Sequence, residues 1–240
     1  MNTRLRDRKP HLGTWLSIGS PVIAELAAQC GFDWLLFDLE HGCASESELL
    51  AQLQAIRGTN VTAIVRVGAP HADWIARVLD WGADGIMVPH VSSAAEAEAC
   101  VKAMRYPPRG LRGVSRSVRA HGYGLRAFEA DEPILIAQIE TVEAVERAAE
   151  IARVDGVDVL FVGPADLRFD LAARPAKATR DYDTCLREVA AAGKPCGILL
   201  RDRTEAEKLR KLGFTHIAFD SDLGILRAGF QNITSYKPTE

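Results

Sequence analysis

Trp34-Leu35-Leu36-Phe37-Asp38-Leu39-Glu40-His41 is a short apolar run that ends in two acids and a histidine. The apolar part is nearly continuous, as in a parallel strand that is covered on both faces. Three later apolar runs lead in the same way to Arg66, Glu140 and Asp166. Charged groups just past the ends of successive buried strands indicate one functional site at one end of a parallel sheet.

Runs of this kind recur eight times along the chain, and amphipathic helical patterns lie between them. The predicted strands are residues 13–18, 34–38, 62–67, 85–89, 134–139, 157–162, 196–200 and 216–220. The predicted helices are residues 21–30, 45–57, 72–81, 94–104, 142–152, 183–192 and 204–212. Eight alternating units without a linker predict an α/β fold, a single (β/α)8 TIM barrel over residues 1–240. A doubly wound sheet is the alternative, but the chain has no GxGxxG or GxxxxGK[ST] motif.

The composition is that of an ordinary globular enzyme. The chain has 240 residues, of which 48% are hydrophobic and 25% are charged, and a net charge of −3. We therefore expect no nucleic-acid partner and no membrane association, and we expect a cytoplasmic location because no apolar leader precedes the first strand. The five cysteines are scattered without CxxC spacing, which argues against a zinc site and a disulfide framework.

Glu140 and Asp166 are candidate metal ligands. They follow neighbouring strands, and adjacent strands lie about 4.8 Å apart, so the two carboxylates can meet at one point. Two oxygen donors without clustered histidine or cysteine suit Mg²⁺ or Mn²⁺, with water and substrate completing the coordination. The alternative is that Glu140 only caps the helix that begins near Thr141.

Arg66, His41 and Asp80 are candidate catalytic residues. Arg66 emerges from an apolar strand and needs an anionic partner, either a substrate or a structural ion pair with Asp38 or Glu40. His41 is the histidine best placed to act as a general base, although a lone histidine is often structural. Asp80 is a weaker candidate, because it closes a predicted helix.

The sequence Gly163-Pro164-Ala165-Asp166 predicts a tight loop that opens a short helix. Free backbone N–H groups of Ala165 and Asp166 would suit a carboxylate or a phosphate. No lysine stands at or just past the C-terminal end of a predicted strand. Schiff-base catalysis, which requires a lysine in the pocket, is therefore not expected.

Several separate motifs, in one order over about residues 11–167, resemble the HpcH/HpaI aldolase family. The motifs are Gly31-Phe32-Asp33-Trp34 with Asp38-Leu39-Glu40-His41-Gly42, Val65-Arg66-Val67, Leu79-Asp80-Trp81-Gly82-Ala83, Val88-Pro89, Arg105-Tyr106-Pro107-Pro108-Arg109-Gly110 with Arg112-Gly113, Gln138-Ile139-Glu140-Thr141 and Gly163-Pro164-Ala165-Asp166-Leu167. The resemblance implies a barrel of the phosphoenolpyruvate/pyruvate-domain type. It also implies a class II, metal-dependent lyase that cleaves 4-hydroxy-2-oxo acids to pyruvate and an aldehyde.

The resemblance further implies a role for each candidate residue. Glu140 and Asp166 would hold a divalent cation (Mg²⁺, Mn²⁺ or Co²⁺), Arg66 would stabilise the enolate oxygen, and His41 with Asp80 would move the proton. Gln138 would line the site, and the amides of Ala165 and Asp166 would hold the pyruvate carboxylate. The family also implies a homohexamer built as a trimer of dimers, with the C-terminal helix exchanged between subunits.

The chain departs from the family where the aldehyde would bind. Arg168-Phe169-Asp170 stands where many relatives have serine and a glycine-bearing loop, and residues 222–240 are short and atypical. The arginine-rich segment 106–132 suggests an anionic aldehyde, with Arg116 and Arg119 as the first candidates to contact it. Two other functions fit the same fold: a lyase of the citrate-lyase β type that acts on a CoA thioester, and a catalytically silent 2-oxo-acid-binding protein.

Overall fold

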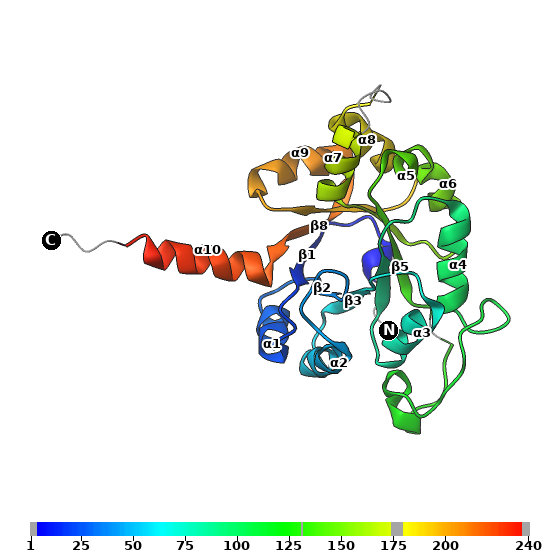
Figure 1. Cartoon of the computed structure of the whole chain (residues 1–240). Coiled ribbons are helices and arrows are strands. Elements are labelled where there is room, and N and C mark those ends of the chain that lie inside the picture. Colours follow the sequence, from blue (N-terminus) through cyan, green and yellow to red (C-terminus); the bar gives the residue numbers. More distant parts are fainter. Residues whose placement is uncertain (1–3, 131, 174–179, 237–240) are drawn as a thin grey trace.

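The strands close into a barrel. The computed structural model describes residues 4–130, 132–173 and 180–236, and these form eight parallel strands, the last of which pairs with the first (Figure 1). The strands are β1 (His11–Leu16), β2 (Trp34–Asp38), β3 (Thr62–Arg66), β4 (Gly85–Val88), β5 (Ile134–Ile139), β6 (Val159–Val162), β7 (Cys196–Leu200) and β8 (Phe214–Ser221). The predicted (β/α)8 barrel is confirmed, with strand ends within two residues of those predicted. Closure of the sheet excludes the doubly wound alternative.

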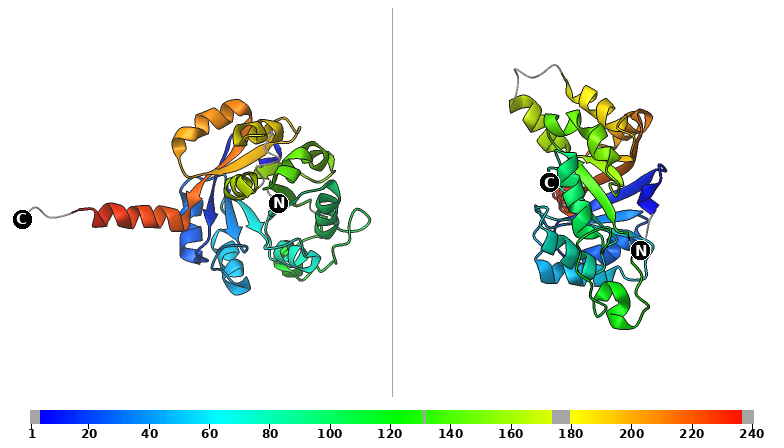
Figure 2. Two further views of the ribbon diagram at one scale, coloured as in Figure 1. Left: turned by 45° about the horizontal axis from the view of Figure 1, so that its top comes forward. Right: turned by 90° about the vertical axis from the view of Figure 1, so that its right-hand side faces the viewer.

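Helices cover the outside of the barrel (Figure 2). They are α1 (Pro21–Gln29), α2 (Glu46–Ala55), α3 (Ala72–Asp80), α4 (Ala94–Met104), α5 (Val142–Glu146), α6 (Ala148–Arg153), α7 (Pro164–Ala173), α8 (Tyr182–Ala190), α9 (Ala206–Leu212) and α10 (Asp222–Thr234), with short 3-10 segments η1 (Arg4–Arg6), η2 (Arg119–Gly124) and η4 (Arg203–Glu205). The single helix predicted over residues 142–152 is two helices, because the backbone leaves helical geometry at Arg147 (φ −103°, ψ 6°). The capping box of Ser45 and Glu48 forms as predicted.

Three aromatic side chains fill the barrel interior. Trp15, Trp34 and Phe161 have ring centroids 5.3–5.9 Å apart and pack partly edge to face. A Cβ on Gly13 would lie 2.2 Å from Cε2 of Trp34, so only glycine leaves room for the indole. The interior is therefore a solid core, as expected of an eight-stranded barrel, and the site is restricted to its open end.

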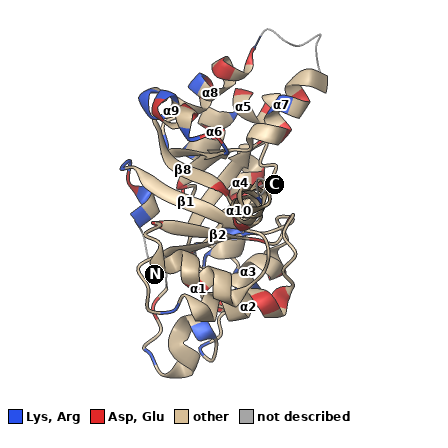
Figure 3. Ribbon diagram, turned by 90° about the vertical axis from the view of Figure 1, so that its left-hand side faces the viewer, with Lys and Arg blue, Asp and Glu red and all other residues tan. Residues whose placement is uncertain are grey.

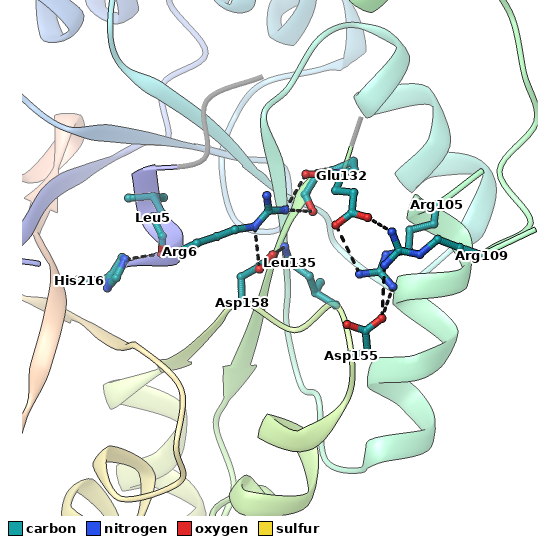
Figure 4. A network of polar contacts seen from close by, with 10 residues as sticks. Leu5, Arg6, Arg105, Arg109, Glu132, Leu135, Asp155, Asp158 and His216 are labelled. Atoms are coloured by element: carbon teal, nitrogen blue, oxygen red, sulfur yellow. Dashed lines mark hydrogen bonds and ion pairs between the residues drawn. The ribbon is translucent and has the colours of Figure 1, made fainter. Parts of the chain in front are cut away.

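The N-terminal segment closes the opposite end of the barrel (Figure 4). Leu5 is fully buried, and Arg6 binds the carboxylate of Asp158 (Nε–Oδ1 2.9 Å) and the carbonyl of Glu132 (Nη2–O 2.6 Å). Asp158 directly precedes β6, so these contacts lie at the N-terminal ends of the strands. These contacts hold η1 against the N-terminal ends of the strands.

Helix α10 projects away from the barrel in both views that show it from the side (Figures 1 and 2). Its apolar side chains are 39–71% exposed, and they are Leu223, Ile225, Leu226, Phe230 and Ile233. A helix of this kind normally buries its apolar residues against another element. α10 therefore presents an apolar surface that the described part of this chain does not cover.

Charges of both signs are dispersed over the helices in the view of Figure 3. Among the described residues, no helix is long and apolar enough to cross a membrane.

The buried side chain of His216, on β8, is expected to make the folded protein less stable in acid. Its Nε2–H donates to the carbonyl of Leu5 (2.9 Å), and burial, with a smaller effect of nearby His11, lowers the pKa of His216 from 6.5 to about 4. Protonation therefore favours the unfolded chain, and stability falls as the pH drops from about 6.5 toward 4, by about 1.4 kcal/mol per pH unit. In urea unfolding at pH 7 and pH 5, we expect native protein to lose about 2 kcal/mol more than His216→Gln. Equal losses in the two proteins would contradict this.

Candidate active site

Five of the seven predicted site residues line a cavity of about 610 Å³ at the C-terminal ends of the strands. Its lining includes His41, Arg66, Gln138, Ala165 and Asp166, with Trp15 and Phe161 of the barrel interior also exposed to it. These residues come from β1, β3, β5 and β6, from the turn after β2 and from the first turn of α7. The fold thus brings together residues that are up to 151 positions apart in sequence, from Trp15 to Asp166.

Arg66 is held by a two-pronged ion pair. Asp38 and Arg66 are the last residues of β2 and β3 and face each other in the register of the sheet. The guanidinium Nε and Nη2 donate to the two carboxylate oxygens of Asp38 at 2.9 and 2.7 Å, and Nη1 lies 2.9 Å from Oε2 of Glu40. Both partners of the pair are buried, with 9% and 2% of their side chains exposed. Burial lowers the pKa of Arg66, but Asp38, Glu40 and Glu140 outweigh it and raise the pKa.

Arg66 therefore forms the structural ion pair with Asp38 and Glu40 that the sequence offered as an alternative. Asp38 also determines the conformation of the turn that follows β2. Its Oδ1 accepts hydrogen bonds from the backbone N–H groups of Glu40 (3.0 Å) and His41 (3.2 Å). This turn places His41 at the mouth of the cavity, where its side chain is 70% exposed. The ring Nε2 lies 3.9 Å from Oε2 of Glu40, and thus the imidazole stands beside a carboxylate and open to solvent.

Glu140 is a buried carboxylate with two different neighbours. Its Oε2 accepts the backbone N–H of His90 (2.8 Å) and lies 3.0 Å from the Nδ1 of the same residue. Its Oε1 lies against Gly163, where a Cβ would approach to 2.5 Å, so glycine is required for this close approach. Burial raises the pKa of Glu140, and the charges of Asp166 and Glu40 add to this, while the contacts with His90 oppose it.

Asp166 stands in the first turn of α7, which begins at Pro164 directly after Gly163. The first intrahelical bond runs from the N–H of Leu167 to the carbonyl of Gly163 (3.0 Å), so the amides of Ala165 and Asp166 precede it. Both residues line the cavity, where N–H groups at a helix N-terminus attract an anion. Gln138, on β5, is buried in the same wall, and its Oε1 has no hydrogen-bond partner among the described residues.

The donor set fits a hard divalent cation. The charge of Asp166 contributes to raising the pKa of Glu140, and a cation between the two carboxylates would offset the cost of burying Glu140 in its charged form. The described residues contain no group of three or more His, Cys, Asp and Glu side chains arranged around a common metal position. A cation such as Mg²⁺, which keeps several water or substrate ligands, suits two carboxylates, whereas a structural zinc ion would require more protein donors.

Two predicted site residues do not line the cavity: Glu140, which packs against the lining residue Gly163, and Asp80, which lies at the other end of the barrel. Asp80 is the last residue of α3, and helices of the barrel run opposite to the strands, so it lies at their N-terminal ends. Its Oδ1 binds Nη2 of Arg112 at 2.6 Å, and the guanidinium of Arg112 lies 4.6 Å from the ring centroid of Tyr106. Within one chain, Asp80 thus stabilises the long segment after α4, and the expected partnership with His41 is not formed.

The two loop arginines expected near the aldehyde also lie elsewhere. Arg119 donates to the carbonyl of Leu53 (2.8 Å) and contacts the carbonyl of Trp81, at the C-terminal parts of α2 and α3. Arg116 lies over the ring of Phe128 within the same loop, 6.0 Å from its centroid. Neither lines the cavity, so the expectation that this loop supplies the acceptor contacts is not supported.

Several residues that line or border the cavity were not selected as site residues from the sequence, among them His90, Arg168, Tyr182 and Arg201. His90 follows β4 and has a left-handed φ of 55°, and Arg201 follows β7. Both are polar residues just past the C-terminal end of a strand, which is the criterion by which Arg66 and Glu140 were selected. Arg168, on α7, belongs to the departure from the family that the sequence places on the aldehyde side, whereas nothing in the sequence indicated Tyr182 on α8. All but His90 line the cavity.

A buried arginine, two carboxylates and the N–H groups at the start of α7 lie at the C-terminal end of the barrel, where the active sites of (β/α)8 enzymes are found. Comparison with known proteins shows to which family of enzymes the chain belongs. The HpcH/HpaI aldolase/citrate lyase family model matches residues 11–228. The chain is 37% identical to the pyruvate aldolase of Rhizobium etli (97% of this chain, 94% of the relative). It is 42% identical to the 4-hydroxy-2-oxovalerate aldolase of Novosphingobium aromaticivorans (89% and 85%).

A solved structure agrees with the sequence matches. An HpcH/HpaI aldolase/citrate lyase family protein from Burkholderia cenocepacia superposes with a TM-score of 0.89 at 35% identity, covering 98% of this chain and 97% of that one. The chain belongs to the HpcH/HpaI aldolase/citrate lyase family and is a carbon–carbon lyase of the aldolase type. The family resemblance seen in the sequence is thereby confirmed.

Proposed function

We propose that this enzyme is a class II aldolase that reversibly cleaves 4-hydroxy-2-oxo acids into pyruvate and an aldehyde. The observation that carries the proposal is that Arg66, Asp166 and the start of α7 line one cavity, while the charge of the buried Glu140 acts on Arg66 and that of Asp166 acts on Glu140. This set offers positive charge and hydrogen-bond donors to both ends of a 2-oxo acid. The relatives named as pyruvate and hydroxyoxovalerate aldolases support the same chemistry.

The residues divide the work as follows. Glu140 and Asp166 would hold a divalent cation (Mg²⁺, Mn²⁺ or Co²⁺), which supplies Lewis-acid charge beside the oxygens of the oxo acid. The N–H groups of Ala165 and Asp166 bind the pyruvate carboxylate, and Gln138 offers its amide to the same region. Arg66, kept rigid by Asp38 and Glu40, places a fixed positive charge where the oxygen at C2 becomes negative.

His41 is the proposed base, acting through water from the mouth of the cavity. In cleavage it takes the proton of the 4-hydroxyl, the C3–C4 bond breaks, and its electron pair forms the enolate of pyruvate, which then takes a proton at C3. In synthesis, C3 loses a proton, the enolate carbon attacks the aldehyde carbon, and the resulting alkoxide takes a proton. The reaction balances without an oxidant or a reductant. We assign Asp80 no part in this step within one chain, because it binds Arg112.

A pyruvate-release assay tests the proposal. Purified enzyme is given a panel of 4-hydroxy-2-oxo acids, with malyl-CoA and citramalyl-CoA as alternative substrates. Pyruvate is detected with lactate dehydrogenase, and acetyl-CoA, which both thioesters release on cleavage, is detected by chromatography. We expect EDTA-sensitive release from the oxo acids and none from the thioesters. Release from the thioesters alone would favour a citrate-lyase-type activity, and no release from any substrate would favour a silent binding protein.

We also propose that α10 packs on a second copy of the chain. Its exposed apolar residues on a projecting helix require a cover that the described residues do not provide. Exchange of this helix between subunits, within a homohexamer built from dimers, satisfies that requirement.

A further inference from the structure

Asp222, the first residue of α10, is a buried carboxylate that the proposed reaction does not use. α10 leaves the barrel where β8 ends, next to β1 (Figure 1). The Oδ1 of Asp222 accepts the backbone N–H of Ser17 (2.9 Å), and its Oδ2 accepts that of Ile18 (3.0 Å). Hydrogen bonds to a charged carboxylate are stronger than those between neutral groups. Asp222 therefore fixes the chain at the point where β1 ends.

The sheet itself does not hold this part of the chain. The pairing of β1 with β8 ends with Trp15 opposite Ser221, so Ser17 and Ile18 lie beyond the last pair. A buried backbone N–H needs an acceptor, and the carboxylate of Asp222 serves two of these groups at once. The side chain thus continues the attachment of β1 where the backbone pairing stops.

Ser17 in turn holds the turn that carries His41. Its carbonyl accepts the N–H of Cys43 (2.7 Å), two residues after His41. Gly42 lies between the carbonyls of Asp38 and Ser17, where a Cβ would collide with the first. The carboxylate of Asp38 accepts the N–H of His41 (3.2 Å) on the other side. The turn is therefore attached at two points, one through Asp38 and one through Ser17.

The position of the imidazole depends on this turn. The side chain of His41 is 70% exposed, and its Nε2 lies 3.9 Å from Oε2 of Glu40. Packing therefore contributes little to its placement, which follows from the backbone that carries it. A displacement of about 1 Å in a reacting group can cost about 10²-fold in rate.

We propose that Asp222 is a positioning residue for the base: it fixes Ser17, Ser17 fixes the turn, and the turn places His41 at the cavity. The inference rests on the proposed aldolase function, in which His41 moves the proton. It adds a connection between the start of α10 and that step. A carboxylate that only stabilised the end of β1 would affect unfolding and leave the chemistry of the folded enzyme unchanged.

A double-mutant cycle separates these two roles. Pyruvate release from a 4-hydroxy-2-oxo acid is measured for native enzyme, Asp222→Asn, Asp222→Ala, His41→Ala and the double variant His41→Ala/Asp222→Asn. Asparagine keeps the shape and one acceptor oxygen, so Asp222→Asn decides the test if Asp222→Ala does not fold. We expect kcat to fall about 10-fold in Asp222→Asn and about 10²-fold in Asp222→Ala, with KM changed by less than about twofold. KM is spared because other residues bind the oxo acid.

The cycle has a defined contrary outcome. If Asp222 acts through His41, Asp222→Asn should cause no further loss once His41 is alanine. Independent losses that multiply in the double variant, or a native kcat in folded Asp222→Asn, would overturn the inference.

Asp33→Asn is the matched control. The Oδ2 of Asp33 accepts the N–H of Leu12 (2.8 Å), so this variant weakens the same strand at its opposite end. We expect its kcat to stay within about twofold of native, because no contact of this end reaches the turn of His41. An equal fall of kcat in Asp33→Asn and Asp222→Asn would show that loosening β1 anywhere is sufficient, and the positioning role would be wrong.

Hydrogen–deuterium exchange of the Cys43 amide tests the same link without substrate. We expect this N–H to exchange about tenfold faster in Asp222→Asn than in native enzyme, because its acceptor on Ser17 is no longer held, and to be unchanged in Asp33→Asn. Unchanged exchange in Asp222→Asn would contradict the link. Native enzyme that releases no pyruvate would contradict the proposed function instead, and the amide exchange distinguishes the two failures.

Discussion

Replacing Arg66 with lysine is expected to lower kcat for pyruvate release by about 10²–10³-fold, because the ammonium group is not held in the fixed position that the guanidinium has at the enolate oxygen. Lysine cannot reproduce the fork that binds both oxygens of Asp38 while a third nitrogen faces Glu40. KM for the oxo acid should change less than kcat, since the charge on that oxygen develops only in the transition state. Steady-state kinetics with a 4-hydroxy-2-oxo acid measures both.

Alanine at the same position tests a second consequence. From the sequence alone, Arg66→Ala is expected to abolish turnover with the fold intact. The buried ion pair changes that expectation, because removal of the arginine leaves Asp38 and Glu40 buried without a counter-charge, at about 3–5 kcal/mol. Arg66→Lys, monitored by circular dichroism, is therefore the better variant, and Arg147→Lys on the surface is its control. Near-native kcat in folded Arg66→Lys would remove the role assigned to this residue.

Replacing Glu140 with glutamine is expected to abolish stabilisation by Mn²⁺ and to reduce kcat by about 10³-fold, since one of two metal ligands is lost. For native enzyme, Mn²⁺ at about 100 times its Kd should add about 2.7 kcal/mol of stability, or roughly 5–10 °C in Tm. Thermal unfolding with MnCl₂ or EDTA measures the shift without any assay of activity. Glu143 is an exposed glutamate three residues after Glu140, and Glu143→Gln should keep the full increase of Tm with Mn²⁺.

Without metal, Glu140→Gln should be more stable than the native enzyme, whereas with Mn²⁺ the native enzyme should be the more stable of the two. Burial raises the pKa of Glu140 in the folded state, so ionisation favours unfolding as the pH rises above the usual glutamate value of 4.5. Without metal at pH 7, Glu140→Gln should therefore unfold at a higher temperature than native enzyme, and the difference should shrink toward pH 4.5. A variant that is less stable than native at pH 7 with EDTA would show that Glu140 is a structural cap, as the alternative interpretation holds.

The architecture was predictable because buried parallel strands carry a strong local signal. Each is a short, nearly continuous apolar run, and eight of them in alternation with helices leave few possible folds. The site followed from the same signal, because residues that end parallel strands must meet at one edge. Arg66 and Glu140 obey this rule directly, and Asp166 opens the helix that follows β6.

The sequence also pointed to three residues that lie away from the cavity: Asp80, Arg116 and Arg119. Asp80 closes a helix, and helix ends in a barrel lie at the face opposite the strand ends, so its position could have excluded it. The loop arginines gave no such indication, because the course of a long loop depends on contacts with distant groups such as the carbonyl of Leu53. Arg168 and Tyr182 meet only through the packing of α7 against α8, which a single sequence does not reveal.

The central claim is that Arg66, Glu140 and Asp166 stabilise the enolate of pyruvate. Proton NMR of the pyruvate methyl group in D₂O, with enzyme and without any aldehyde, measures formation of that enolate directly. We expect exchange with Mn²⁺ or Mg²⁺ present, loss of exchange with EDTA, and a rate reduced by at least about 10²-fold in Arg66→Lys and Glu140→Gln. Exchange at the native rate in both variants, or in the presence of EDTA, would contradict the account.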